Sequence, residues 1–326
     1  MDKLALYPHL GEFCENLETF RRRNGLNYDL IFGHYWLSGM AGKTLAEWWG
    51  VPLVVMFHTL GAVKNAFGIG ETEPALRLEA EKKLARSCQR IIAATDREKL
   101  DLVRCYRAET ENIAVIPCGV NPAHFYPRKV NRTALGLSDG RFVLYAGRIE
   151  PLKGIDRLIK AMALLDNSLR LVIIGGDGQS QGEINRLRQL ARELGLDDRV
   201  TFLGLIAHDN MPDFYRAASV LVVPSHYESF GMVALEALAS GTPVVATDVG
   251  NMRNVIRQGE TGYIIDGSPE SIARSIDDLL AKPPDLQRTH KISVSVAHLS
   301  WGNIARDIIR ECYRVIEEQP VSMGSR

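Results

Sequence analysis

Two basic side chains stand five residues apart in a glycine-bounded turn that follows an apolar run. The turn reads Gly147-Arg148-Ile149-Glu150-Pro151-Leu152-Lys153-Gly154. An arginine offers a planar fork of donors and a lysine a compact point charge, and together they suit the spread negative charge of a diphosphate. Because Arg and Lys are mostly solvated surface residues, the turn alone leaves both interpretations open, a phosphate site and a plain surface.

Two carboxylates lie around a predicted helix start further along the chain. Glu228 follows an apolar run, and Glu236 lies within the apolar stretch after it. We predict a helix that begins near Ser229 or Phe230 and stops at Gly241. A rise of about 1.5 Å per residue puts the two carboxylates about 12 Å apart along the helix axis.

That separation decides what the two carboxylates could do. Paired carboxylates of hydrolytic glycosidases lie about 5–9.5 Å apart, so Glu228 and Glu236 are better placed to grip two parts of one extended ligand. The amide groups at the helix start would add an anion site. These amides belong to Phe230, Gly231, Met232 and Val233. The alternatives are an internal partner for Glu236 and a solvated acid near a helix start for Glu228.

A second set of polar side chains follows two apolar runs in the first half of the chain. His34 and Tyr35 follow the first run, and His58 and Thr59 follow the second. A lone histidine is usually a core or surface residue. Two histidines at successive strand ends, each beside a hydroxyl-bearing residue, favour a binding site.

Apolar runs of strand length alternate with amphipathic stretches along the whole chain. The predicted strands are 29–33, 52–57, 90–94, 112–116, 142–146, 171–174, 200–203, 220–223, 243–246 and 262–265. The predicted helices include 10–23, 155–165, 181–194, 269–280 and 300–318. Strands that are apolar on both faces and separated by helices predict an α/β fold with parallel sheets. Ligands bind beyond the carboxyl ends of such strands, and the polar residues described above fall there.

A proline-rich segment with little periodicity, 117–140, divides the two series of strands and predicts a linker. We therefore predict two Rossmann-like domains, 1–120 and 121–299, that face each other across a cleft. The last helix, 300–318, is expected to pack back on the first domain.

Composition narrows the classes of partner. The 326 residues include 39 basic and 39 acidic side chains, a balance that argues against nucleic acid. Five scattered cysteines without a C-x-x-C pair predict free thiols in a reducing cytoplasm. No apolar run approaches the roughly 20 residues that span a bilayer, while peripheral membrane contact stays open. No metal-ligand spacing is present, and no metal site is predicted.

Several motifs around these residues resemble those of a known family. They are Gly147-Arg148…Lys153-Gly154, Pro224-Ser225, Glu228-Ser229-Phe230-Gly231, Glu236-Ala237, Gly241-x-Pro243-Val244-Val245, Val249-Gly250 and Gly259-x-x-Gly262. Together they resemble the signature of the retaining nucleotide-sugar glycosyltransferases of glycosyltransferase family 4, which have the GT-B fold. The resemblance covers about 29 to 313.

The resemblance implies a donor site and a role for each of its residues. The implied set is Gly147, Arg148, Lys153, Glu228, Ser229, Phe230, Gly231, Met232, Val233 and Glu236. Arg148 and Lys153 would bind the diphosphate and stabilise its charge as it departs. Glu228 would hold hydroxyls of the transferred sugar, and Glu236 the nucleotide ribose. The co-substrate would be a UDP-, ADP- or GDP-linked hexose, transferred with retention by front-face attack, with no cofactor and no metal required.

The first-half segments resemble the acceptor side of family members that glycosylate a phosphorylated sugar or inositol. The nearest likenesses are the inositol-phosphate glycosyltransferases and the sucrose-phosphate synthases. This likeness implies that Tyr35, Thr59 and Arg77 contact the acceptor and that Lys64 adds a cation within reach. His58 would lie near the transferred sugar and join the catalytic set. The alternative for Arg77 is an ion pair on a helix surface, which contributes little.

The start of the chain departs from the family pattern. Members begin with a strand, a glycine-rich turn and a helix that face the donor phosphates, and no such segment precedes Asp29. We therefore expect an incomplete N-terminal domain with an exposed sheet edge. Three explanations stay open. The protein could start upstream of Met1, another chain could supply the segment, or the chain could be an inactive remnant.

This departure keeps a second hypothesis open, a truncated, catalytically impaired protein that still binds a nucleotide sugar. A third, a dinucleotide oxidoreductase, is disfavoured because Gly176-Asp177-Gly178 lacks the third glycine of the G-x-G-x-x-G fingerprint.

Overall fold

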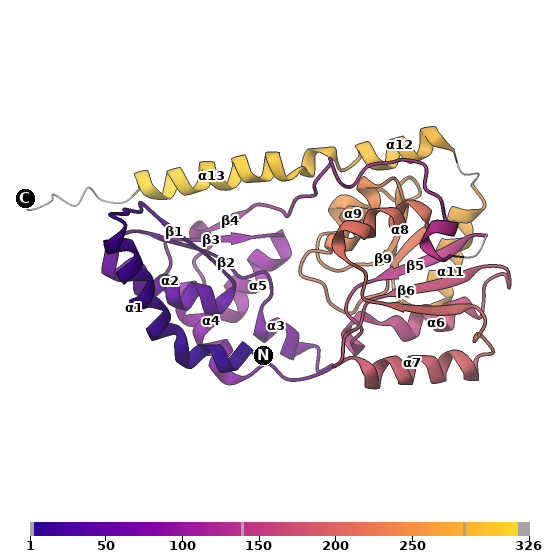
Figure 1. The fold of residues 1–326 in the computed structure, drawn as a ribbon, viewed down its shortest axis with the longest axis horizontal. Helices are drawn as coiled ribbons and strands as arrows, with labels where there is room; N and C mark the ends of the chain where they lie inside the picture. The colour runs from indigo at the N-terminus through magenta and orange to yellow at the C-terminus, as the bar shows by residue number, and fades with distance from the viewer. Residues whose placement is uncertain (1–2, 138–139, 283–284, 319–326) are drawn as a thin grey trace, which may run out of the picture. The chain divides into compact units, whose positions relative to one another are not determined.

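The computed structural model describes residues 3–137, 140–282 and 285–318, which form two compact units (Figure 1). One unit consists of Met1–Pro117 with Ile304–Arg326, and the other of Cys118–Asn303. Each unit has its own parallel sheet and its own buried core.

The first unit is built on a four-stranded parallel sheet in the order β1-β2-β3-β4. Its strands are β1 (Ile31–His34), β2 (Leu53–Met56), β3 (Arg90–Ala93) and β4 (Ile113–Val115). Its helices before the linker are α1 (Leu10–Arg23), α2 (Tyr35–Trp49), α3 (Gly61–Ala66), α4 (Ala75–Ser87) and α5 (Asp96–Tyr106). Because spatial order follows chain order, right-handed crossovers place the connecting helices on one face. Trp36, Leu84 and Leu102 from these helices pack with Val55 and Ile91 of the sheet.

The last helix, α13 (Trp301–Glu317), belongs to this first unit from Ile304 onward. Arg90 of β3 pairs with Glu311 of α13, with Nε and Oε1 2.9 Å apart, and both residues are buried. This ion pair fixes a helix from the end of the chain to a strand in its first third.

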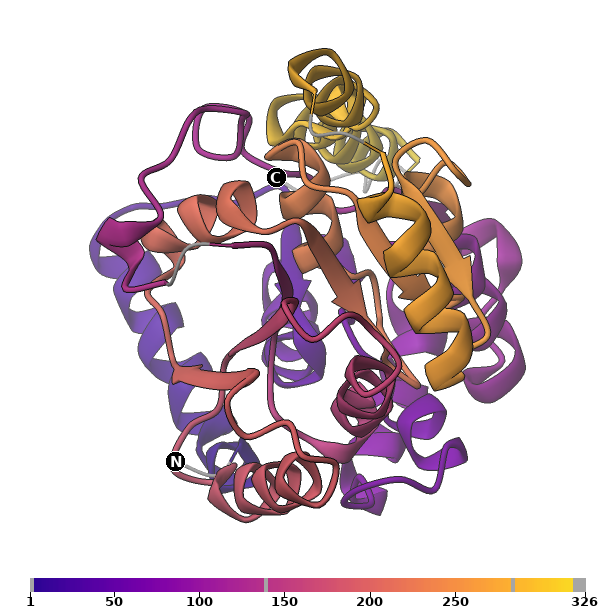
Figure 2. The same cartoon turned by 90° about the vertical axis from the view of Figure 1, so that its right-hand side faces the viewer.

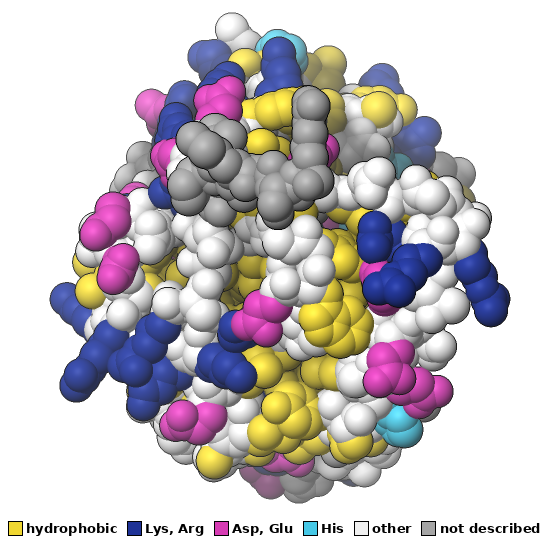
Figure 3. Space-filling model, turned by 90° about the vertical axis from the view of Figure 1, so that its left-hand side faces the viewer, with side chains coloured by type: hydrophobic (Ala, Val, Ile, Leu, Met, Phe, Trp, Pro, Cys, Tyr) yellow, Lys and Arg dark blue, Asp and Glu magenta, His cyan; other side chains and the backbone are white. Residues whose placement is uncertain are grey.

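β1 ends the sheet of the first unit, with β2 as its one neighbour in the sheet order. Figure 3 looks onto this end of the molecule and shows hydrophobic side chains gathered among charged ones. About half of the surface of Phe13, Phe20 and Trp48 is exposed in this unit. The unit therefore presents apolar side chains at its surface and β1 as an edge strand.

The second unit carries a six-stranded parallel sheet in the order β10-β9-β8-β5-β6-β7. Its strands are β5 (Phe142–Ala146), β6 (Arg170–Ile174), β7 (Val200–Gly204), β8 (Val220–Val223), β9 (Val244–Thr247) and β10 (Gly262–Ile265). Its helices are α6 (Ile155–Met162), α7 (Gln181–Glu193), α8 (Met211–Ala217), α9 (Met232–Ala239), α10 (Met252–Val255), α11 (Pro269–Leu280) and α12 (Leu286–Val294). Figures 1 and 2 show α6 and α7 on one face of this sheet, with α8 and α9 on the other.

The strand order of the second unit reverses between β5 and β8. The chain runs outward from β5 through β6 to β7, then returns to place β8 on the other side of β5. The loops that follow β5 and β8 therefore start side by side and diverge to opposite faces. This switch point is where open α/β sheets bind ligands.

The structure confirms the predicted α/β class, and each predicted strand is present within a few residues. The predicted helices 10–23 and 269–280 coincide with α1 and α11. None of the helices within the described part of the chain is long and apolar enough to cross a bilayer.

Candidate functional site

Two glycines in the left-handed region shape the loop after β5. Gly147 has a φ of 149° and Gly154 a φ of 62°. A Cβ on Gly154 would lie 2.3 Å from the carbonyl oxygen of Pro224, so glycine lets this loop approach the loop after β8. Tyr145 supports the turn, since its hydroxyl donates to the carbonyl of Arg148 at 2.7 Å.

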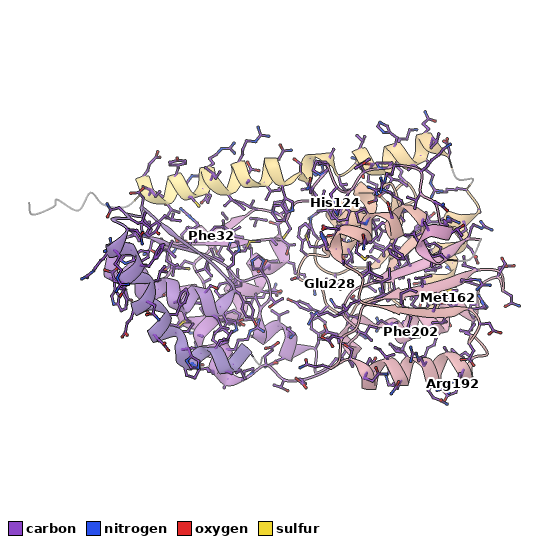
Figure 4. All side chains as sticks on the ribbon, viewed as in Figure 1. Phe32, His124, Met162, Arg192, Phe202 and Glu228 are labelled. Carbon is purple, nitrogen blue, oxygen red and sulfur yellow. The ribbon has the colours of Figure 1, made fainter. Side chains whose placement is uncertain are left out.

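The two loops bring Lys153 and Glu228 together. Lys153 Nζ donates to Glu228 Oε1 at 2.7 Å, and Ser225 Oγ donates to the same oxygen at 2.9 Å. The His226 amide donates to the carbonyl of Leu152 at 2.8 Å and ties the loops by their backbones. Lys153 is buried, with 9% of its surface exposed. Figure 4 labels Glu228 in its place among the neighbouring side chains.

Arg148, the second predicted phosphate ligand, has a different environment. Its side chain is 65% exposed and pairs with Glu150, with Nη2 and Oε1 3.0 Å apart. The site thus holds one buried, oriented ammonium at Lys153 and one solvated guanidinium at Arg148, two residues after β5 ends. Both cations belong to the loop that leaves the switch point.

The helix between the two carboxylates begins later than the sequence predicted. α9 starts at Met232, and its N-cap is Gly231 with a φ of 98°, so the prediction of a start near Ser229 or Phe230 was wrong. The carbonyl of Phe230 accepts from the Asn251 amide at 2.9 Å, which draws this segment toward the loop after β9. The first-turn amides of α9 are therefore those of Met232 and Val233, which have no acceptor within the helix.

Glu236 is buried on α9 and has two partners. Tyr215 Oη donates to its Oε2 at 2.7 Å, and His208 Nε2 lies 3.1 Å from its Oε1. Burial, together with the Glu236 charge, raises the pKa of Tyr215 well above its ordinary value, so its hydroxyl stays protonated and donates. The carboxylate that looked costly in an apolar helix is stabilised by groups from α8 and the turn before it.

In the first unit, the two strand-end histidines meet. His34 Nδ1 and His58 Nε2 lie 2.8 Å apart, and their rings stack with centroids separated by 5.1 Å. Burial lowers the pKa of both rings, and the neighbouring His34 lowers that of His58 further. Tyr35 and His58 both have a positive φ, of 73° and 63°, a conformation uncommon outside glycine that clusters at functional sites.

Three of the four predicted acceptor-side residues, Tyr35, Thr59 and Lys64, lie around the guanidinium of the fourth, Arg77. Arg77 is 3% exposed, and its Nη2 donates to the side chain and the carbonyl of Thr59 at 2.9 and 3.0 Å. The Tyr35 ring lies 5.1 Å from the guanidinium carbon. Glu73 bridges the cations, since Oε2 is 2.8 Å from Arg77 Nη1 and Oε1 pairs with Lys64. The alternative of a surface ion pair for Arg77 is wrong, because the side chain is buried.

A buried carboxylate anchors the loop that carries His58. Glu81 accepts from Arg77 Nε at 2.7 Å and from the Gly61 amide at 2.9 Å. Tyr106 donates to the same carboxylate and accepts from the Ala62 amide at 2.9 Å. The start of α3 and the residues before it are therefore held from beneath by a fully hydrogen-bonded polar network.

Comparison with known proteins assigns the chain to a family. The family model described as glycosyl transferases group 1 matches residues 127–293, and that of glycosyltransferase family 4 matches residues 4–124. The chain belongs to the group 1 glycosyltransferases. This confirms the resemblance inferred from the motifs, and the two parallel-sheet units are those of the GT-B fold.

Relatives of this group 1 glycosyltransferase include proteins named D-inositol 3-phosphate glycosyltransferase. That of Acidothermus cellulolyticus is 42% identical over 299 residues, which cover 86% of this chain and 66% of the relative. That of Streptomyces bingchenggensis is 44% identical over 276 residues, covering 80% and 61%. The chain thus spans less than two thirds of the length of these relatives.

Solved structures share the fold. Sucrose-phosphate synthase from Thermosynechococcus elongatus superposes with a TM-score of 0.85 at 32% identity, covering 98% of this chain and 81% of the other. An Anabaena protein solved with UDP-glucose gives a TM-score of 0.80 at 22% identity, covering 96% and 84%, a likeness of fold alone.

Several residues that complete these sites were missed by the sequence predictions. Tyr215 and His208, the partners of Glu236, lie on a helix and a turn with no motif of their own. Glu73 could have been found, because it stands four residues before Arg77, as Glu81, a predicted neighbour of Arg77 on its helix, stands four residues after it.

Proposed function

We propose that this chain carries the donor site and part of the acceptor side of a retaining hexosyltransferase. The reaction moves a hexosyl group from a UDP-, ADP- or GDP-linked sugar to a hydroxyl of a phosphorylated sugar or an inositol phosphate. The observation that carries the proposal is the Lys153–Glu228 ion pair at the switch point of the second unit. The names of the inositol-phosphate relatives and of the sucrose-phosphate synthase support the acceptor class.

The donor side supplies charge where the leaving group develops it. Breaking the bond between the sugar and the diphosphate leaves negative charge on the nucleoside diphosphate. Lys153, buried and fixed, and Arg148, at the surface, place positive charge at that position without a metal ion. The α9 amides of Met232 and Val233 add donors, and Glu236 holds the ribose.

Glu228 acts as a holder of sugar hydroxyls rather than as a nucleophile. Its Oε1 already accepts from Lys153 and Ser225, which lowers its nucleophilicity and fixes its position. Retention then follows from front-face attack, in which the departing phosphate oxygen takes the acceptor's proton.

The acceptor side is assigned to the network around Arg77. Tyr35, Thr59 and Lys64 surround this guanidinium, and an acceptor phosphate would take the place that Glu73 occupies between the two cations. His58, held by His34, would contact the transferred sugar.

The proposed reaction is tested by incubating the purified chain with UDP-, ADP- and GDP-hexoses, with and without inositol phosphate or a sugar phosphate. We expect nucleoside diphosphate release that depends on the acceptor, and a product with the donor's anomeric configuration by NMR. Acceptor-independent binding without release would support the impaired nucleotide-sugar-binding protein instead. An inverted product would refute the retaining mechanism.

A matched pair of variants tests the donor site. Lys153→Ala should weaken nucleoside diphosphate binding by roughly tenfold or more, since a charge-assisted hydrogen bond contributes about 1.5–3 kcal/mol. Lys160→Ala, on the exposed face of α6, should leave the affinity unchanged by calorimetry. Equal affinities for the two variants would remove Lys153 from the site.

A further inference from the structure

A cluster of metal-ligand side chains lies in the second unit, apart from Lys153 and Glu228. His124, His208 and Asp209 each bring one ligand atom to within 4.8 Å of the others. His124 lies within the linker segment 117–140, and His208 and Asp209 lie in the turn before α8. Because more than 80 residues separate them, no spacing in the sequence could have predicted the group.

His124 presents a polar atom that lacks a partner. Its Nε2 is buried and has no hydrogen bond among the described residues. Asp209 Oδ1 lies 4.0 Å away, too far for a hydrogen bond. Buried polar atoms are nearly always satisfied, so an ion or a water is expected at this nitrogen, although the His124 side chain as a whole is 30% exposed. Figure 4 labels His124 on the side of the sheet that α8 and α9 cover.

The 4.0 Å distance between His124 Nε2 and Asp209 Oδ1 is close to one that a transition metal can bridge. Zinc bonds of about 2.0–2.2 Å to imidazole nitrogen and carboxylate oxygen put two ligands of a tetrahedral site about 3.4 Å apart. The exposed side chain of Asp209 can close the remaining distance by torsional adjustment. Two imidazoles and a carboxylate are the ligand types of zinc rather than of calcium or magnesium.

The backbone around the cluster is held in place. Arg216 of α8 donates to the carbonyl of His124 at 2.7 Å and to that of Tyr126 at 2.7 Å, which clamps this segment to α8. Phe125 is buried and packs edge-on against the His208 ring, with centroids 5.4 Å apart. Both halves of the cluster are therefore anchored to one helix before any ion arrives.

His208 also has the outer partner that metal-binding histidines use. Its Nε2 faces Glu236 Oε1 at 3.1 Å, so an ion would bind the other ring nitrogen, Nδ1. A carboxylate behind a histidine orients the ring and increases its basicity toward the metal. We propose that His124, His208 and Asp209 form a site for Zn²⁺ or a similar divalent transition metal, with Glu236 as the outer partner and one position open.

The test titrates Zn²⁺ alone into the metal-free full chain by calorimetry, and Co²⁺ alone while following its visible absorption. We expect one ion per chain and a four-coordinate Co²⁺ spectrum. His124→Ala and His208→Ala should each weaken the affinity at least about tenfold. His290→Ala, an exposed histidine on α12 outside the cluster, should leave it unchanged.

Two results would overturn the proposal. One is a wild-type chain that takes up no Zn²⁺ at micromolar concentration. The other is a His208→Ala chain, folded by circular dichroism, that binds Zn²⁺ as tightly as the wild type. The His208 side chain is 66% exposed, so its removal should leave the fold intact even if the removal of His124 does not. None of these measurements depends on nucleotide-sugar turnover, so their outcome tests the metal site independently of the proposed function.

Discussion

At the scale of single residues, the basic side chains of each site are paired with acidic side chains of the same site. Lys153 pairs with Glu228 in the second unit, and Lys64 and Arg77 share Glu73 in the first. Buried charges are costly unless paired, so each proposed ligand-binding cation has an internal carboxylate as its resting partner. A bound anion must then compete with that carboxylate, and the competition sets the affinity.

Glu73 provides the clearest case for this competition. Burial tends to raise its pKa, but Lys64 and Arg77 outweigh burial and lower the pKa below its usual value, so the carboxylate is ionised at neutral pH. Glu73→Gln removes the charge while keeping the shape. We expect roughly tenfold tighter binding of an inositol phosphate or of inorganic phosphate, measured by calorimetry.

Glu71→Gln is the matched control, since this exposed acid lies two residues away and should change nothing. Weaker phosphate binding in Glu73→Gln would show that the carboxylate positions the cations for the ligand rather than occupying its place.

The sequence predicted which residue types form each site but not how they pair. Arg148, Lys153, Glu228 and Glu236 were identifiable from their motifs, because loops at strand ends carry ligands whatever the rest of the chain does. The Tyr215–Glu236 and His34–His58 hydrogen bonds depend on tertiary packing that no spacing records. Local patterns therefore located the candidate sites, while the partners came from the fold.

At the scale of elements, a glycine decides how close the loops after β5 and β8 can come. Gly154→Ala would place a Cβ 2.3 Å from the carbonyl of Pro224 in a backbone conformation that L side chains rarely adopt. We expect a loss of about 1–3 kcal/mol in unfolding free energy by denaturant titration and weaker nucleoside diphosphate binding. Gly182→Ala, in α7 with open space around it, should be neutral or slightly stabilising.

If Gly154→Ala leaves donor binding unchanged, the close approach of the two loops is not what forms the site.

A glycine also explains the incorrect start predicted for α9. A polar, serine-containing segment favoured an earlier cap, but the left-handed Gly231 and the hydrogen bond from Asn251 to Phe230 fixed the start at Met232.

The start of α5 makes stability depend on pH. Glu98 Oε2 accepts from the Ala94 amide at 2.7 Å, while its Oε1 is buried without a partner among the described residues. Burial raises the pKa of Glu98 to about 7. An acid whose pKa is raised on folding binds more protons when folded, so its contribution to stability falls as pH rises from the unfolded value toward 7 and above.

Glu98→Gln should therefore flatten the decrease of unfolding free energy between about pH 5 and pH 8, followed by denaturant titration at several pH values. Thr95→Ala is the control, because it removes the N-cap hydroxyl that accepts a hydrogen bond from the Glu98 amide, and it should cost about 1 kcal/mol at every pH. A Glu98→Gln chain with the wild-type pH dependence would place the titrating group elsewhere.

At the scale of the whole molecule, the donor residues and the proposed metal ligands belong to one unit of the fold. The unit 118–303 contains a complete six-stranded sheet, its own core and the switch point with Arg148, Lys153, Glu228 and Glu236. The first unit depends instead on α13 from the far end of the chain, through the buried Arg90–Glu311 pair. The two units should therefore differ in their ability to fold alone.

We expect residues 118–303, expressed alone, to fold cooperatively and to bind nucleoside diphosphate within a few-fold of the full chain's affinity, because its ligands and its core are internal. Residues 1–117 alone should fold poorly, because removing α13 takes away the Arg90–Glu311 pair and the buried apolar side chains of Ile304 and Val315. Circular dichroism, denaturant titration and calorimetry measure both outcomes. A folded 118–303 chain that binds no nucleotide would mean that the donor site needs groups from the first unit, and the assignment of donor binding to the second unit would have to be abandoned.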